Sequence, residues 1–226
     1  MIFLFDCDGV LVDSEIVAAS VDVAILASVG HKISTEDVIH RYAGLTFQAM
    51  VAIIAKETGR TFPKDIFDKQ QAELDRRLMR ETKPVAGAID ILTKITGPRG
   101  VCSNSTNDRL RITLGSAELI EAFEPHIYSA VEVGDRQPKP APNVYVHAAQ
   151  QFGVEPKDCI VVEDTVFGVA AAKAAGARVV GFTGASHSWP GHADVLTEAG
   201  AEIVINRFRD LPAVAEALAS WAGLPD

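Results

Sequence analysis

The chain has 226 residues, of which 48% are hydrophobic and 23% charged, proportions typical of a globular protein with a sizeable core. Its formal net charge of −9 argues against nucleic acid or an anionic membrane surface as a partner, because both attract basic surfaces. The N-terminal segment MIFLFDCDGV is apolar only briefly and lacks a basic leader, so we expect a cytoplasmic protein without a signal peptide or membrane span.

Six short apolar runs, each bounded by turn residues, are typical of buried strands. Stretches of helical periodicity lie between most of them, for example residues 142–153, which begin with Pro142 and end with Gly153. Strands that alternate with helices are covered on both faces, so this pattern predicts a parallel sheet in an α/β fold. The predicted strands are Ile2–Phe5, Gly100–Cys102, Ile127–Ser129, Ile160–Val162, Val179–Phe182 and Ile203–Ile205.

The first predicted strand ends in two acids at alternate positions, Asp6 and Asp8, followed by Gly9. Alternate residues of an extended strand share a face, so both carboxylates can point toward one ligand. In an open α/β sheet, ligands bind outside the carboxyl ends of the strands. The alternative is a turn in which Asp8-Gly9 merely closes the strand, as Asp-Gly pairs commonly do.

Residues 14–84 interrupt the alternation of strands and helices. They contain four helical patterns and no strand pattern, and they lie between the first and second predicted strands. We therefore expect a helical cap over residues 14–84, and an α/β core formed by residues 1–13 and 85–226. The run 85–88 would return the chain to that core.

The second predicted strand ends in a run of small polar residues, and a helix is expected to begin near Asn107. Ser103 and Asn104 there offer a hydroxyl, an amide and backbone N–H donors at a helix N-terminus, which is where proteins hold phosphate groups. The alternative is an ordinary helix cap, because Ser and Asn are common in that position.

A lysine, Lys139, lies between Pro138 and Pro140, on a backbone stiffened from both sides. Such a frame favours an ammonium group held against an anion. A proline-rich surface turn that happens to contain a lysine is the alternative interpretation.

The fourth predicted strand ends in two adjacent acids, Glu163 and Asp164, and Thr165 opens the helix that follows. Carboxylate oxygens at a strand end suit Mg²⁺, which prefers a few carboxylates together with water and substrate phosphate. The alternative is capping, since acids are favourable at a helix N-terminus.

The three cysteines, Cys7, Cys102 and Cys159, each lie in an apolar run. Their spacing suggests neither a disulfide framework nor a zinc site. We expect buried free thiols on core strands.

The order of these polar strand ends along the chain resembles the haloacid dehalogenase superfamily, and within it the phosphatases whose helical cap follows the first motif. The segment DCDGVLVDS, residues 6–14, matches the first motif of that family, and the similarity spans essentially the whole core. The resemblance implies a Rossmann-like parallel-sheet core with an inserted all-helical cap domain. It also implies a Mg²⁺-dependent phosphoric monoester hydrolase that acts on a small-molecule phosphate ester, with no protein partner.

The resemblance also implies roles for the catalytic residues. Asp6 would be the nucleophile that forms an aspartyl-phosphate, and Asp8 would protonate the leaving alcohol and later activate water. Ser103 would hold the phosphoryl oxygens, with Asn104 beside it. Lys139 would steady the nucleophile and the phosphate.

By the same resemblance, Mg²⁺ would be held by Glu163 and Asp164 together with Asp6 and the backbone carbonyl of Asp8. Since Asp6 must stay ionised while Asp8 carries a proton in the first step, their surroundings would have to separate their two pKa values.

Three alternatives to a phosphatase fit the sequence less well. Sugar phosphomutases of this subfamily carry a histidine early in the first cap helix and an arginine in the cap loop, where this chain has Ala18 and Phe47. Dehalogenases lack the second acid of the first motif, so Asp8 argues against that chemistry. A non-catalytic binding protein would be expected to have lost one of the acids or Lys139, and none is missing.

Residues of the cap are expected to choose the substrate. The candidates are Tyr42, Gly44, Thr46 and Phe47, and less favoured are Arg76 and Arg77, for which a solvated helix face is the better interpretation. Family analogy alone favours a sugar or sugar-acid monophosphate.

Overall fold

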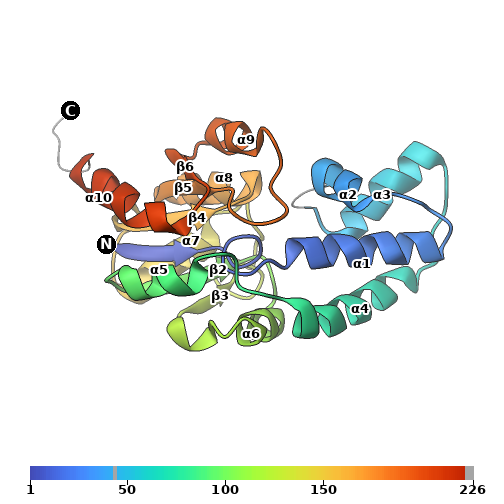
Figure 1. Ribbon diagram of the computed structural model, residues 1–226, viewed down its shortest axis with the longest axis horizontal. Coiled ribbons are helices and arrows are strands. Elements are labelled where there is room, and N and C mark those ends of the chain that lie inside the picture. The colour runs from blue at the N-terminus through green and yellow to red at the C-terminus, as the bar shows by residue number, and fades with distance from the viewer. Residues whose placement is uncertain (43–44, 222–226) are drawn as a thin grey trace.

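A six-stranded, all-parallel sheet forms the centre of the larger part of the molecule in the computed structural model, which describes residues 1–42 and 45–221 (Figure 1). All six predicted strands are present, with bounds within one residue of the prediction. Their bounds are β1 Ile2–Phe5, β2 Arg99–Ser103, β3 Ile127–Ser129, β4 Cys159–Glu163, β5 Arg178–Phe182 and β6 Ile203–Ile205.

The strand order is β3-β2-β1-β4-β5-β6, so β1 lies between β2 on one side and β4 on the other. Leu4 of β1 is in register with Gly100 of β2 and with Val161 of β4. The chain therefore winds outward from β1 in both directions, and the carboxyl end of β1 opens onto the crevice where such sheets bind ligands.

Helices cover both faces of this sheet (Figure 1). Because side chains alternate along a strand, Phe3 and Phe5 pack on one face in a cluster with α5, α6 and α10, while Ile2 and Leu4 pack on the other with α7, α8 and α9. The predicted α/β fold class is thus confirmed. The helices are α5 Ala88–Lys94, α6 Asn107–Ser116, α7 Asn143–Phe152, α8 Val166–Ala175, α9 His192–Ala199 and α10 Leu211–Trp221, with short 3₁₀ turns at Ile120–Ala122, Pro156–Asp158 and Phe208–Asp210.

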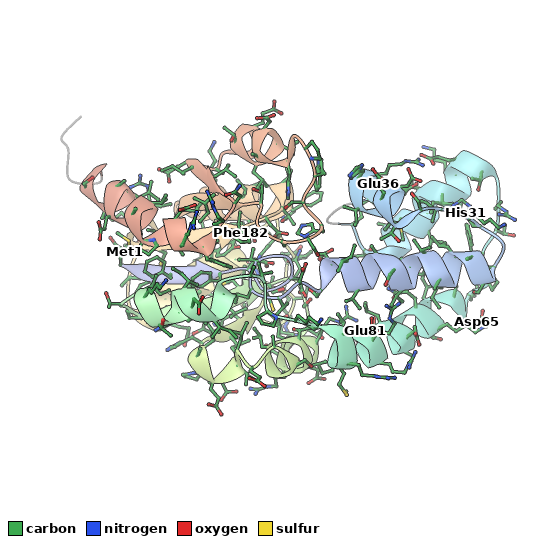
Figure 2. The ribbon with its side chains drawn as sticks, in the orientation of Figure 1. Met1, His31, Glu36, Asp65, Glu81 and Phe182 are labelled. Atoms are coloured by element: carbon green, nitrogen blue, oxygen red, sulfur yellow. The ribbon has the colours of Figure 1, made fainter. Side chains whose placement is uncertain are left out.

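The expected helical insert is present as four helices that lie to one side of the sheet (Figure 1). Their bounds are α1 Glu15–Ser28, α2 Thr35–Tyr42, α3 Phe47–Thr58 and α4 Ile66–Glu81. They share an apolar cluster of their own, which includes Leu26, Met50 and Ile54. Figure 2 shows Asp65 at the outer end of this insert and Glu81 near the sheet, so α4 leads the chain back toward the core.

Two connecting segments join the helical insert to the sheet, and they run side by side. The backbone N–H of Asp13 donates to the carbonyl of Lys83, and that of Val85 donates to the carbonyl of Leu11, each at 2.9 Å. The chain therefore leaves and re-enters the core at one place. The division into domains at residues 13/14 and 84/85 stays a prediction.

The three cysteines are buried and free, as predicted. Within residues 1–42 and 45–221, no single helix has the length and apolar character needed to cross a membrane. The helices α2 and α3, bent by 98° to each other, reach that length and apolar character only when taken together.

Candidate active site

The carboxyl end of β1 turns sharply so that its two acids reach the crevice. The N–H of Asp6 still pairs with the carbonyl of Val162 at 3.0 Å, and Gly9 then adopts a φ of 81°. A Cβ added at Gly9 would lie 2.1 Å from the Asp164 carboxylate. Glycine is needed here both for its backbone angle and for this close approach.

Lys139 lies at the centre of the site. Its ammonium donates to Asp6 Oδ1 at 2.6 Å, to Glu163 Oε1 at 2.5 Å and to the carbonyl of Cys102 at 2.6 Å. These acceptors use all three of its N–H donors. Only 3% of the side chain is exposed. Although burial alone would lower the pKa of Lys139, the carboxylates of Asp6 and Glu163 raise it above its usual range.

Asp6 is 7% exposed, and its surroundings have opposing effects on the pKa of its carboxyl. Burial raises the pKa of its carboxyl well above the usual value of 3.8, and the ammonium of Lys139 opposes that rise. Among the described residues, Asp6 Oδ1 accepts a hydrogen bond from Lys139 whereas Oδ2 accepts none, which leaves Oδ2 to face a substrate.

The oxygens of Glu163 are taken up by hydrogen bonds. Besides Lys139, Oε1 accepts from the hydroxyl of Tyr145 at 2.6 Å, while Oε2 accepts from the backbone N–H of Asp164 at 3.2 Å and from Thr165 Oγ1 at 3.3 Å. A Cβ on Gly168 would lie 2.0 Å from this carboxylate, so the start of α8 closes over it. Glu163 therefore anchors Lys139. Tyr145 was missed because it reads as an apolar residue of a helical pattern.

Asp8 is held by serine hydroxyls rather than by a cation. Its Oδ1 accepts from Ser14 Oγ at 2.6 Å, and its Oδ2 accepts from Ser105 Oγ at 2.8 Å and from Ser103 Oγ at 3.5 Å. Ser14 ends the segment 6–14 and Ser105 lies in the polar run after the second strand, but nothing in the sequence showed that their hydroxyls meet Asp8.

The loop after β2 meets the loop that carries Lys139. Asn104 Oδ1 accepts from the backbone N–H of Lys139 at 2.7 Å, and the side chain of Thr106 caps the N-terminus of α6, which begins at Asn107 as predicted. A cavity of about 330 Å³ lies over this edge of the sheet. It is lined by the four predicted catalytic residues, Asp6, Asp8, Ser103 and Lys139, and by Asn104, which was predicted to lie beside the phosphate.

A divalent cation fits the residues beside this cavity. Ligand atoms of Asp6, Glu163 and Asp164 all lie within 4.8 Å of one another. Both carboxylate oxygens of Asp164 are buried without a hydrogen bond from a described residue, as is expected of a carboxylate kept for a metal ion.

Two histidines that the sequence interpretation overlooked lie against Asp164. Nε2 of His192 lies 2.7 Å from the Asp164 carbonyl, and Nε2 of His187 lies 3.0 Å from Asp164 Oδ2 without hydrogen-bond alignment. Both come from the segment after β5. Partners of this kind fix the orientation of a metal-binding carboxylate.

The profile of the haloacid dehalogenase-like hydrolases matches residues 3–182. The chain belongs to this family. It is 30% identical over 187 residues to 6-phosphogluconate phosphatase of Escherichia coli (strain K12), covering 82% of this chain and 84% of that protein. It is also 30% identical over 190 residues to the fructose-1-phosphate phosphatase YqaB of the same strain, covering 78% and 93%.

A solved structure is similar over almost the whole chain. The conserved haloacid dehalogenase-like protein of unknown function ATU0790 from Agrobacterium tumefaciens str. C58 superimposes with a TM-score of 0.92 at 47% identity, covering 96% of this chain and 98% of that one. The family assignment is thereby confirmed. Since the relatives are phosphatases, this haloacid dehalogenase-like hydrolase is a phosphoric monoester hydrolase.

A second cavity of this hydrolase, of about 260 Å³, lies among the helices of the insert. Three predicted cap residues line it: Tyr42, Thr46 and Phe47. Thr46 also caps α3 by accepting from the backbone N–H of Ala49, and Phe47 packs against Phe67. The fourth predicted cap residue, Gly44, lies outside the described residues.

The two less favoured arginines pair within α4. Arg76 pairs with Glu73, and Arg77 pairs with Glu81, both at 2.6 Å. Neither is among the described residues that line the two cavities. A different arginine, Arg109 of α6, lines both of them.

Proposed function

We propose that this enzyme hydrolyses a small phosphorylated metabolite, a sugar or sugar-acid monophosphate, in the cytoplasm through an aspartyl-phosphate on Asp6. The observation that carries the proposal is the buried contact of Lys139 with Asp6 Oδ1 at 2.6 Å, on the wall of a cavity that also holds Asp8. The names of the two phosphatase relatives, which concern a sugar acid and a sugar, support this substrate class.

Asp6 would attack the phosphorus through Oδ2, which no described residue occupies. As the bond from oxygen to phosphorus forms, the ester oxygen would leave with the proton of Asp8, which lines the same cavity. In the second step a water molecule would give its proton to Asp8 and attack the phosphorus. Phosphate would depart, and Asp6 would regain its carboxylate.

The cations would balance the charge of the phosphoryl group. The N–H groups of the loop at Ser103 and Asn104 would hold its oxygens, and Lys139, whose three donors are already in use, would attract them through its charge. Mg²⁺ would be bound by Asp6, Asp164 and the backbone carbonyl of Asp8. Glu163, expected from the sequence as a further ligand, has both oxygens in hydrogen bonds and would instead add its charge from beside Lys139. When bound, the ion would neutralise charge on the phosphoryl oxygens.

A panel of phosphorylated metabolites, followed by phosphorus NMR with and without Mg²⁺, tests the proposal. We expect inorganic phosphate as the product. A hexose 1-phosphate that became the 6-phosphate faster than it released phosphate would instead favour a mutase. Mutases carry a histidine and an arginine at the positions of Ala18 and Phe47. Both residues line the second cavity, and neither has a polar side-chain atom that could bind a second phosphate.

Removal of the metal should stop the reaction. Excess chelator is expected to abolish phosphate release, and Mg²⁺ should restore it better than Ca²⁺, whose coordination is larger and looser. Asp164→Ala should raise the Mg²⁺ concentration needed for half-maximal activity, measured by titrating the metal against initial rate. Full activity in excess chelator would refute the metal assignment.

The Asp8→Asn variant should discriminate between leaving groups. An aryl phosphate leaves easily without a proton, whereas an alkyl phosphate needs one, so the first step should slow more for the alkyl ester, by about tenfold or more. Burst kinetics on both esters measures that step. Equal losses for the two esters would count against Asp8 as the acid.

A further inference from the structure

The second cavity adjoins the cavity over the catalytic residues. Five residues line both, and they surround the place where the two cavities meet, which we call the passage. A substrate whose phosphate lies beside Lys139 would therefore extend its leaving group through this passage into the helical insert. The shared residues are Glu15, Leu45, Thr46, Gln71 and Arg109.

Two carboxylates line the second cavity, and one of them, Asp22, lies outside the cavity over the catalytic residues. Glu15, Ala19 and Asp22 are spaced along one face of α1, and all three line this cavity. Asp22 Oδ1 accepts from Gln70 Nε2 at 2.7 Å, while Oδ2 accepts no hydrogen bond from a described residue. Burial raises the pKa of Asp22 to about 6, against the lowering effects of Gln70 and Arg109, so the group is mainly ionised at pH 7.

Arg109, the arginine that lines the second cavity, already forms an ion pair. Arg109 Nη2 pairs with Asp75 Oδ1 at 3.0 Å, and Asp75 Oδ2 accepts from Gln71 Nε2 at 2.9 Å. Asp22, in contrast, forms no ion pair with a described residue. The second cavity thus presents a carboxylate that forms no ion pair with a described residue, although the charge of Arg109 acts on it from nearby.

Two residues that line the same cavity carry buried hydrogen-bond donors without a partner among the described residues. The hydroxyl of Tyr42 and Nε of Arg109 are buried, and neither bonds to a described residue. Such groups carry a free-energy cost until a ligand or water satisfies them. The residues that line this cavity therefore include an acceptor, Asp22 Oδ2, and two donors, on Tyr42 and Arg109, that have no hydrogen-bond partner among the described residues.

We infer that the second cavity receives the leaving group and selects a neutral, polyhydroxylated chain, with Asp22 accepting from its hydroxyls and rejecting a carboxylate. A hydroxyl both donates and accepts, so it can serve Asp22 and the donors of Tyr42 and Arg109 alike. An ionised carboxylate only accepts, and it adds a like charge beside Asp22. This specificity rests on the proposed function and narrows it to sugar and alditol phosphates.

Two substrates that differ at one carbon test the inference. Sorbitol 6-phosphate and 6-phosphogluconate share a six-carbon chain, but C1 is a hydroxymethyl group in the first and a carboxylate in the second. We expect kcat/KM for sorbitol 6-phosphate to be higher by about tenfold or more, because a like-charge contact in a partly buried site costs at least that factor.

Asp22→Asn should narrow this ratio to within about threefold, chiefly by improving 6-phosphogluconate. Asparagine still accepts from Gln70, and its amide can donate to a carboxylate. Asp68→Asn, an exposed change on α4 outside both cavities, is the matched control and should leave the ratio as it is.

A wild-type preference for 6-phosphogluconate, or the same ratio in Asp22→Asn as in wild type, would overturn the inference. Hydrolysis of an aryl phosphate by the wild-type enzyme distinguishes failure of the specificity inference from failure of the proposed function. If wild-type enzyme with Mg²⁺ hydrolyses the aryl ester but the ratio does not respond to Asp22, only the specificity is wrong. If it hydrolyses none of the three esters, the proposed function itself is refuted.

Discussion

Replacing Asp6 by asparagine is expected to lower phosphate release by at least about a thousandfold, the scale of loss seen when a covalent nucleophile is removed. An amide cannot form the bond to phosphorus. The fold should remain, because asparagine has nearly the same volume and Lys139 keeps Glu163 and the Cys102 carbonyl as acceptors. Initial rates on an aryl phosphate, with circular dichroism of the same samples, measure both effects.

Asp90→Asn is the matched control for this change. Asp90 is exposed on α5 and lies outside both cavities, so its replacement should leave turnover within about twofold of wild type. Phosphate release at a near wild-type rate from Asp6→Asn would exclude Asp6 as the nucleophile.

Replacing Lys139 by methionine should abolish activity and also destabilise the fold. The substitution keeps most of the volume but leaves Asp6 and Glu163 buried without their cation. Breaking a buried ion pair by removing one partner costs about 3–5 kcal/mol. We expect a decrease of that size in the free energy of unfolding in urea near pH 8.

This loss of stability should depend on pH. Burial raises the pKa of Asp6, and Lys139, which opposes the rise, is absent from the variant. A carboxyl whose pKa is higher in the folded than in the unfolded chain binds its proton more tightly when folded. Its protonation therefore stabilises the fold as pH decreases from the folded pKa toward the unfolded value of about 4. The difference in unfolding free energy between wild type and Lys139→Met should thus be smaller at pH 5 than at pH 8.

Lys157→Met provides the control, since Lys157 is exposed and forms no ion pair with a described residue. It should change the unfolding free energy by less than about 0.5 kcal/mol at either pH. A Lys139→Met variant as stable as wild type at pH 8 would contradict the buried ion-pair network.

The sheet was predictable because its strands carry strong local signals. Each is an apolar run ended by polar or turn residues, and the parallel arrangement follows from the helices between them. The same signals led to the active site, because parallel strands place their carboxyl ends at one edge. Asp6, Ser103 and Glu163 could therefore be expected together before their distances were known.

The rest of the site depends on contacts that leave no local pattern. Tyr145 occupies an apolar position of α7, and only packing against β4 brings its hydroxyl to Glu163. Asp22 reads as a polar residue of α1 until Gln70, 48 residues later, is placed beside it. The arginines show that contacts between distant segments escape the sequence. Arg76 of α4 is a candidate from the sequence but lines neither cavity, whereas Arg109, on α6 of the core, lines both.

Borohydride reduction of acid-quenched enzyme tests most directly whether Asp6 carries the phosphoryl group. Reduction converts an aspartyl-phosphate to homoserine, which peptide mass spectrometry assigns to a position. The Asp8→Asn variant with an aryl phosphate and Mg²⁺ suits the experiment, because loss of the base should slow the second step and let the intermediate accumulate. We predict homoserine at position 6 that appears only with substrate. Turnover of the ester with Asp6 unmodified throughout, or homoserine at another aspartate, would contradict the mechanism.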